Sequence, residues 1–315
     1  MRRRCERAED RLLHRRGRKP RHLHAARRPR GLNVVEISKG GPLGILAGGG
    51  GLPNLVAQAA ARAGREPLIF ALAGDAEERK TSGFPVFRIR WGEIGRLERL
   101  LKEHHCKEVV LVGAVKRPEI KDIRPDFGAL RLMPRIISAI RSGDDSALKS
   151  AAGIFEEYGV ELLDPLAVAP ELACPPGLLV EGRTALDADE LAKAAEAARM
   201  IGDLDIGQAA VACGRRVVAL EGAEGTNGLL SRVREMRLTK RIPRHGGILV
   251  KCMKPSQDPR LDIPTIGPET VEMAREAGLD GIACEAGRTM LVGRDETFAA
   301  FRAARLFLYG IRRRP

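Results

Sequence analysis

The chain has little of what histidine- and cysteine-based chemistry needs. Only three histidines, His104, His105 and His245, lie beyond the basic N-terminal segment. The adjacent pair ends a predicted helix, where imidazoles suit the negative end of the helix dipole. The six cysteines form no C-x-x-C pair, which favours reduced thiols in a cytosolic protein over a disulfide framework or a zinc site. Neither G-x-S-x-G nor H-E-x-x-H occurs. These absences argue against histidine-based acid–base catalysis and against both motif-defined hydrolase classes.

Long apolar runs are also missing, and positive charge is confined to the two ends. No run approaches membrane-spanning length, so any membrane contact is expected to be peripheral. Of the net charge of +13, Met1–Leu32 carries thirteen Lys and Arg against three acids, and Arg312–Arg314 adds three more. The body is therefore neutral, and nucleic acid is not the expected partner of its fold.

The N-terminal segment, residues 1–38, has too few aliphatic residues to form a core and lacks the apolar stretch of a secretory signal. Three interpretations stay open for it. It is a disordered arm that touches acidic lipid or nucleic acid, a transit-like segment, or the product of a start assigned too far upstream. We favour the last, because a fold that begins near Val34 leaves the arm no packing role.

With 315 residues, the chain is long enough for two domains. Short apolar strands alternate with amphipathic helices from Leu43 to Gly113, which predicts a parallel, Rossmann-like βαβ sheet. Prolines and glycines dominate residues 165–184, the expected linker. We therefore predict an α/β protein with a Rossmann-like nucleotide-binding domain over 39–164, a mixed α/β domain carrying the catalytic loop over 185–311, and a basic tail at 312–315.

In the second domain, strands at Ala209–Cys213 and Arg216–Leu220 meet at Gly214 and predict a hairpin. Further strands and helices alternate after it. Helices are predicted at 187–201, 228–236, 268–277 and 295–304, and strands at 248–252, 281–284, 290–292 and 306–309.

The run Gly48–Gly51 follows an apolar strand and precedes a helix that starts at Leu52-Pro53. Glycines let backbone N–H groups approach a ligand, and the start of a helix favours an anion. The run is neither G-x-G-x-x-G nor a P-loop, so a phosphate site and a plain tight turn remain alternatives.

Several polar loops follow predicted strands, where ligands of α/β folds bind. Their cations and carboxylates suit pyrophosphate chemistry, since Lys and Arg neutralise phosphoryl oxygens and acids hold Mg²⁺ or position water. Lys251 ends a strand and Lys254 follows it, where a flexible ammonium reaches a phosphate. Singly, such residues are more often helix caps or solvated turn residues, as Asp144, Glu224 and Arg288 illustrate.

The order of these motifs resembles the alphaproteobacterial-type UDP-2,3-diacylglucosamine pyrophosphatase family of lipid A biosynthesis. The resemblance runs from about Leu43 to Gly310. It rests on eight segments in order: Leu46–Gly50 with Leu52-Pro53, Gly113-x-Val115-x-Arg117-Pro118, Gly143–Asp145, Leu204–Gln208, Glu224–Thr226, Lys254-Pro255-x-Gln257, Asp262-x-Pro264–Gly267 and Glu285–Arg288.

The resemblance implies a cytoplasmic, Mg²⁺-dependent dimer, peripheral at the inner membrane, that hydrolyses UDP-2,3-diacylglucosamine to UMP and 2,3-diacylglucosamine 1-phosphate. It implies three groups of site residues. The catalytic position is Asn227, with Glu224 and Thr226 beside it, and Asp144, Asp145 and Glu221 are candidates for metal. The expected substrate contacts are Gly48, Gly49, Gly50, Leu52, Pro53, Arg117, Gln208, Lys251, Lys254, Gln257, Thr265 and Arg288.

One position departs from the family pattern. The family's Glu-Gly-Thr-Asp motif ends in Asn227 here. A carboxamide neither carries charge nor accepts a proton from water, and losing such a group typically costs about 10²- to 10⁴-fold in rate. The alternatives are therefore rescue by Glu221 or Glu224, slow deamidation at Asn227-Gly228, a catalytically impaired lipid-nucleotide-binding homologue, or a nicotinamide-dependent Rossmann oxidoreductase that would use Asp75.

Overall fold

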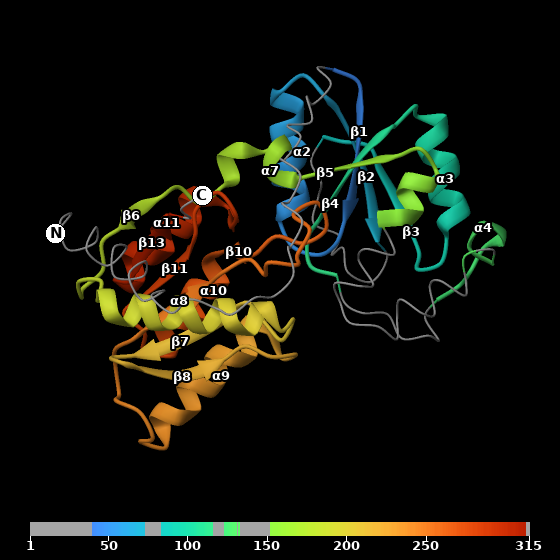
Figure 1. The fold of residues 1–315 in the computed structure, drawn as a ribbon. Helices are drawn as coiled ribbons and strands as arrows, with labels where there is room; N and C mark the ends of the chain where they lie inside the picture. The colour runs from blue at the N-terminus through green and yellow to red at the C-terminus, as the bar shows by residue number, and fades with distance from the viewer. Residues whose placement is uncertain (1–39, 73–82, 116–122, 131, 133–151, 313–315) are drawn as a thin grey trace, which may run out of the picture.

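The N-terminal half is a five-stranded parallel sheet in the order β3-β2-β1-β4-β5 (Figure 1). The structure, a computed structural model, describes residues 40–72, 83–115, 123–130, 132 and 152–312. The strand order is that of a Rossmann-type sheet, as the alternating strands and helices predict. The strands are β1 (Pro42–Ala47), β2 (Glu66–Leu72), β3 (Val86–Ile89), β4 (Glu108–Val112) and β5 (Glu161–Leu163).

Alternate residues of these strands fill two cores, one on each face of the sheet. Leu43 and Ile45 of β1 pack with α2 (Leu52–Arg62) and α7 (Pro165–Val168) on one face. Phe70 of β2 packs on the other face, with α3 (Ile94–Glu103) and the helical residues 152–157. Burial on both faces explains the near-continuous apolar strands.

Asp126 joins two helices of this half. Its carboxylate accepts backbone N–H groups of Gly95 and Arg96 at the start of α3 (3.1 and 2.9 Å) and of Ala129 in α4 (Phe127–Leu130; 2.9 Å). Partial burial raises the pKa of Asp126, but these backbone hydrogen bonds outweigh burial and hold the pKa below its usual value.

The C-terminal half is a six-stranded mixed sheet in the order β6-β13-β11-β9-β7-β8. The neighbours β13, β11 and β9 are parallel, whereas β6, β7 and β8 join by antiparallel pairing, and β7–β8 is the predicted hairpin. The strands are β6 (Gly177–Val180), β7 (Ala209–Cys213), β8 (Arg216–Leu220), β9 (Ile248–Lys251), β11 (Gly281–Glu285) and β13 (Phe307–Ile311).

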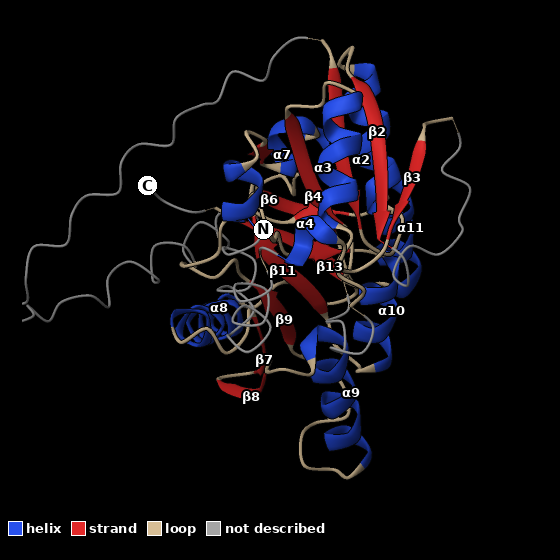
Figure 2. Cartoon of the chain, turned by 90° about the vertical axis from the view of Figure 1, so that its right-hand side faces the viewer, coloured by secondary structure: helices blue, strands red, loops and turns tan. Residues whose placement is uncertain are grey.

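Helices cover both faces of this second sheet. Figure 2 shows α8 (Ala188–Asp203) on one side and α9 (Gly225–Leu238), α10 (Pro268–Glu276) and α11 (Arg294–Ala304) on the other. Asp187 caps α8, accepting the backbone N–H groups of Asp189 and Glu190. The α/β class with a mixed second sheet is confirmed.

Three elements lie within residues 165–184, where the sequence predicts a linker. Both α7 and η2 (Pro170–Leu172) pack on the first sheet, and β6 forms the edge of the second. The predicted strand 290–292 also differs in its role. As β12 (Met290–Leu291), it pairs with β10 (Thr265–Ile266) in a separate two-stranded sheet.

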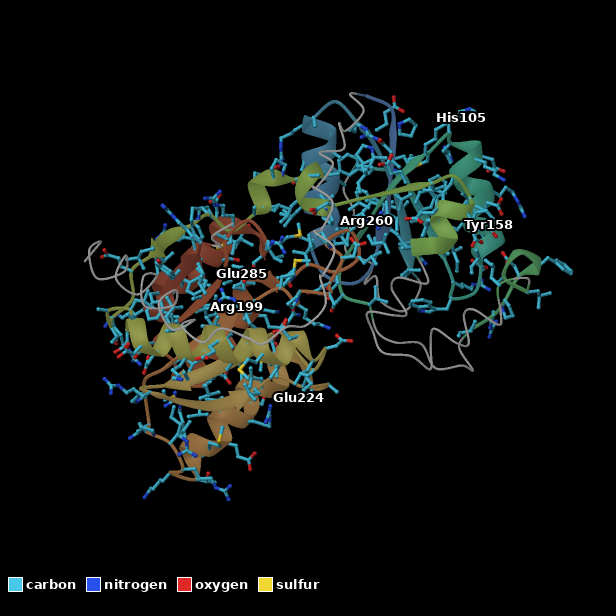
Figure 3. The ribbon with its side chains drawn as sticks, in the orientation of Figure 1. His105, Tyr158, Arg199, Glu224, Arg260 and Glu285 are labelled. Atoms are coloured by element: carbon cyan, nitrogen blue, oxygen red, sulfur yellow. The ribbon has the colours of Figure 1, made fainter. Side chains whose placement is uncertain are left out.

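The loop after β9 reaches across to the N-terminal half. Leu261 belongs to the core on one face of the first sheet and Ile263 to the core on the other. Arg260, labelled in Figure 3, pairs with Glu156 of the first half at 3.5 Å. These contacts fix the loop 251–267 against both halves, which brings polar segments distant in sequence into one region.

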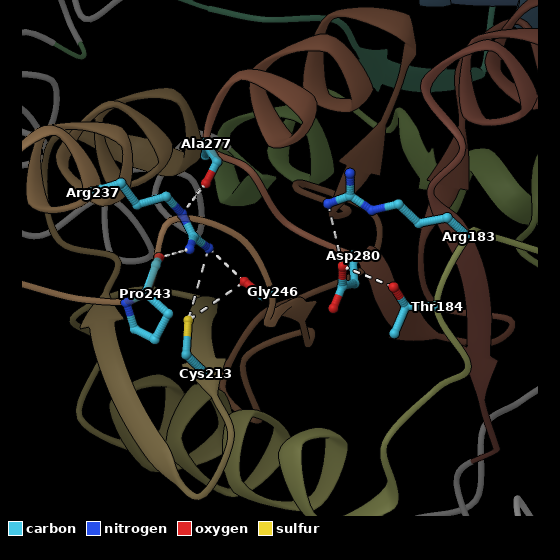
Figure 4. Close-up of polar contacts among 8 residues, drawn as sticks. All are labelled: Arg183, Thr184, Cys213, Arg237, Pro243, Gly246, Ala277 and Asp280. Atoms are coloured by element: carbon cyan, nitrogen blue, oxygen red, sulfur yellow. Dashed lines mark hydrogen bonds and ion pairs between the residues drawn. The ribbon is translucent and has the colours of Figure 1, made fainter. Parts of the chain in front are cut away.

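A buried guanidinium organises the opposite end of the second half. Arg237 of α9 donates to the carbonyl oxygens of Pro243, Gly246 and Ala277 and contacts Cys213 Sγ at 3.8 Å (Figure 4). Burial lowers its pKa. Arg237 therefore ties α9 to the end of α10 and to the β7–β8 hairpin.

Candidate active site

The glycine turn divides into a structural part and an open part. The backbone N–H groups of Gly48 and Gly49 donate to the carbonyl oxygens of Val112 and Ala114 (2.9 and 2.7 Å). A Cβ at Gly48 would overlap the Ala114 carbonyl oxygen. These two glycines therefore serve close backbone pairing with the loop after β4 rather than offering N–H groups to a ligand.

The next two glycines are different. Gly50 has a φ of +88° and Gly51 is the N-cap of α2 without a side-chain cap, and a Cβ at either would meet only open space. Among the described residues, neither backbone N–H makes a hydrogen bond. In the first turn of the helix, the Oδ1 atom of Asn54 is a buried acceptor that has no hydrogen-bond donor within the described part of the chain. An anion at this helix start would meet unpaired backbone donors.

In the C-terminal half, Glu221 joins two of the predicted segments, Leu204–Gln208 and Glu224–Thr226. It is 5% exposed, and its carboxylate accepts the backbone N–H of Gln208 (3.0 Å) and the Thr226 hydroxyl (2.9 Å). A Cβ at Gly207 would overlap the carbonyl oxygen of Glu221, so the close approach of the two loops requires glycine there. Because both carboxylate oxygens are engaged, Glu221 holds the loops together.

Lys251 lies beneath this group with 7% exposure, so its side chain is not the flexible ammonium that the sequence predicts. Its Nζ donates to the Thr265 carbonyl oxygen at 3.2 Å. Burial lowers the pKa of Lys251, whereas the charges of Glu221 and Asp262 oppose that shift. Lys251 is therefore a buried cation whose ammonium is held by a backbone carbonyl oxygen and feels the charges of two carboxylates.

The loop after β9 has polar contacts of its own. Lys254 Nζ pairs with Asp205 at 2.6 Å, and its backbone N–H donates to Gln257 Oε1 at 3.1 Å. Gln257 is buried and donates its amide to Asp262. Gln257 therefore shapes the loop from inside, whereas Lys254 spans the gap to the segment before Gln208.

The last predicted segment lies beside that loop. Glu285 is 2% exposed and accepts hydrogen bonds from the backbone N–H of Met253 (3.3 Å) and the guanidinium of Arg199 (3.4 Å); Figure 3 labels Glu285 and Arg199. Arg288 approaches the sulfur of Met253 at 3.9 Å. The segment 285–288 thus adjoins the loop 251–257.

Asn227, where the family resemblance leads us to expect an aspartate, lies in the first turn of α9. Its Nδ2 donates to Glu269 Oε1 at 3.0 Å, and Glu269 lies in the first turn of α10. Glu224 is engaged elsewhere, since its carboxylate pairs with Arg232. A hydrogen bond from its own backbone N–H, followed by that ion pair, lowers the pKa of Glu224. The sequence reasoning did not select Glu269, which belongs to none of the motifs.

The predicted site residues fall into three groups: those in the C-terminal half, those at the start of α2, and those outside the described residues. Most of the C-terminal ones are brought together by the contacts above. Leu52 shares its apolar core with Ile263 of the loop after β9, which sets the glycine turn beside that loop. Pro53 is buried at the start of α2. Arg117, Asp144 and Asp145 lie outside the described residues, so their predicted roles stay predictions.

The described residues contain no group of three or more His, Cys, Asp or Glu that could hold a metal ion. Glu221 is fully engaged by its two donors. The described part of the chain therefore does not complete a metal centre by itself.

Two family models match successive parts of this chain. The LpxI N-terminal domain model matches residues 42–172, and the LpxI C-terminal domain model matches residues 175–309. The chain belongs to the LpxI family. It is 37% identical over 274 residues to the UDP-2,3-diacylglucosamine pyrophosphatase LpxI of Caulobacter vibrioides, covering 85% of this chain and 97% of that protein.

A solved structure, the Bordetella bronchiseptica enzyme WbmG in complex with NAD, is 19% identical with a TM-score of 0.25. The match covers 40% of this chain and 37% of WbmG, a likeness that carries no argument about function. Within the described residues of this LpxI-family chain, no helix combines the length and apolar character needed to cross a membrane.

Proposed function

We propose that this chain hydrolyses the pyrophosphate of UDP-2,3-diacylglucosamine, releasing UMP and 2,3-diacylglucosamine 1-phosphate for lipid A biosynthesis. The proposal depends on one observation. The chain is 37% identical to a relative named for this activity, over an alignment that covers 97% of that relative, and it matches both LpxI domain models. Family membership favours hydrolysis over the nicotinamide-dependent alternative, whose Asp75 lies outside the described residues.

The site geometry supports an anionic nucleotide ligand. At the start of α2, two backbone N–H groups make no hydrogen bond with the described residues, and cationic side chains lie in the loops of the other half. The Oε1 atom of Gln208 is buried and makes no hydrogen bond among the described residues. A buried acceptor without a donor is costly, and a ligand N–H would satisfy it. Gln208 is therefore our first candidate for a contact with the nucleotide.

The finer parts of the proposal come from the family resemblance. They are dependence on Mg²⁺, a homodimer, and a cytoplasmic location with peripheral contact at the inner membrane, where the product resides. Apolar acyl chains and basic residues such as Arg312 are the groups that such a contact would use. Gel filtration with light scattering tests the dimer, and sedimentation with anionic vesicles tests the membrane contact.

The assay that tests the activity measures UMP release from UDP-2,3-diacylglucosamine with added Mg²⁺ and with a chelator. We expect release by the native chain and its loss on chelation. Release that survives chelation would remove magnesium from the proposal. Substrate binding without release would make the chain a catalytically impaired homologue, and release by neither the native chain nor the Asn227→Asp variant would contradict the proposed function.

A further inference from the structure

The beginnings of two helices meet at the position where this chain departs from its family. Asn227 lies in the first turn of α9 and Glu269 in the first turn of α10, 42 residues later. The Asn227 amide donates to Glu269 Oε1 at 3.0 Å, and both side chains are exposed. The exposed carboxylate is therefore held at the motif position by the carboxamide that replaces the family's acid.

The hydrogen bond engages only one oxygen of Glu269. Among the described residues, Oε2 of Glu269 accepts no hydrogen bond and makes no ion pair. The carboxamide can donate, but it cannot take a proton from water. Of the two side chains at this position, only Glu269 can act as a base, and its second oxygen is open to solvent and ligand.

The other acids of the region are engaged. Glu221 is buried and accepts two hydrogen bonds, Glu224 pairs with Arg232, and Asp205 pairs with Lys254. Both oxygens of Glu221 accept hydrogen bonds, whereas Glu224 and Asp205 are each paired with a cation through one oxygen. Glu269 has no cationic partner among the described residues, and its one contact is with a neutral amide.

The surroundings also favour a pyrophosphate near Glu269. The N-termini of α9 and α10 both carry the positive end of a helix dipole, and the Asn227–Glu269 contact shows that the two ends are adjacent. An anion held there would lie beside the open carboxylate oxygen. Neighbouring helix starts alone would not define a site, but here they coincide with the family's catalytic position.

We propose that Glu269 is the general base of this chain and that Asn227 is the residue that positions it. The inference rests on the proposed function. The water oxygen bonds to one phosphorus of the pyrophosphate while Glu269 Oε2 takes a proton from that water. The bridging P–O bond breaks, and its electron pair leaves on the oxygen of the other phosphate. The attacking oxygen keeps the other proton of the water, so the step consumes one water and yields two phosphate monoesters and a protonated Glu269.

The first test compares Glu269→Gln with Glu272→Gln in the UMP-release assay. Glu272 lies one turn further along α10, is exposed and pairs with Arg275, so it controls for loss of an acid from the same helix. We expect kcat of Glu269→Gln to fall about 10²- to 10⁴-fold with little change in KM, and Glu272→Gln to keep the native rate. Thermal unfolding should be unchanged in both.

The role of Asn227 is tested by Asn227→Ala, which removes the donor. We expect kcat to fall about tenfold while KM changes little, because the carboxylate remains but is no longer held. An unchanged kcat would overturn the positioning role. Full activity in Glu269→Gln, with an active native chain, would overturn the inference about the base and leave the proposed function intact. Absence of release from the native chain would instead count against both.

Discussion

The two halves of the molecule prepare their shares of the site in different ways. The N-terminal half, with its all-parallel sheet buried on both faces, presents backbone: a glycine turn and the open start of α2. The C-terminal half, with its mixed sheet, presents side chains that rest on buried charges, among them Glu221 and Lys251. The first arrangement suits holding an anion, whereas the second can also move a proton.

This difference predicts that the stability of the C-terminal half depends strongly on individual charged side chains. Arg237→Met should lower the free energy of unfolding by about 3 kcal/mol, because three backbone carbonyl oxygens lose their donor. Chemical denaturation measures the change. Arg234→Met is the matched control on the same helix. Its exposed pair with Glu276 should contribute less than about 1 kcal/mol, and equal losses in the two variants would break the comparison.

The stability of the N-terminal half should instead be sensitive to substitutions at glycines where two backbone segments pack closely. Gly48→Ala would force its Cβ against the loop after β4, with an expected cost of about 2 kcal/mol. Gly51→Ala places its Cβ in open space and should cost no more than about 1 kcal/mol. Denaturation of both variants checks the order. A larger loss of stability in Gly51→Ala than in Gly48→Ala would contradict the division of the turn into a structural part and an open part.

A smaller effect concerns the acid that anchors α3 and α4. The pKa of Asp126 is below its usual value in the folded chain, so its stabilisation is present above the unfolded pKa near 3.9 and is lost as pH falls through the lower folded pKa. Asp126→Ala should cost about 1 kcal/mol at pH 7, and this difference should shrink below about pH 4. The exposed Asp203→Ala variant should show neither effect. A gap that stays constant with pH would contradict the assigned hydrogen bonds.

The fold was largely predictable because apolar periodicity and helix caps are local signals. The central strands and the long helices lie within a few residues of their predicted bounds. The missed strands have physical reasons. Val86–Ile89 is a largely exposed edge strand, Glu161–Leu163 is only three residues long, and Gly177–Val180 follows two prolines and gains its place by pairing with a strand more than a hundred residues away.

The site was less predictable, because its contacts are made across the chain. The motif order identified Asn227, and resemblance supplied its meaning. Burial of Lys251 could not be read from its place at the end of a strand, since the covering loop comes from elsewhere. Glu269 belongs to none of the motifs, and an acid in the first turn of a helix is typical of interaction with the helix dipole. Only the approach of α10 to α9 makes it a partner of Asn227.

The central claim is that a single carboxylate, paired with a carboxamide where α9 and α10 begin, carries the proton transfer. The most direct measurement is UMP release by the double variant Asn227→Asp/Glu269→Gln, which exchanges the two groups across the same contact. We predict that the double variant releases UMP at least about tenfold faster than Glu269→Gln alone. A folded double variant as slow as Glu269→Gln would contradict the claim.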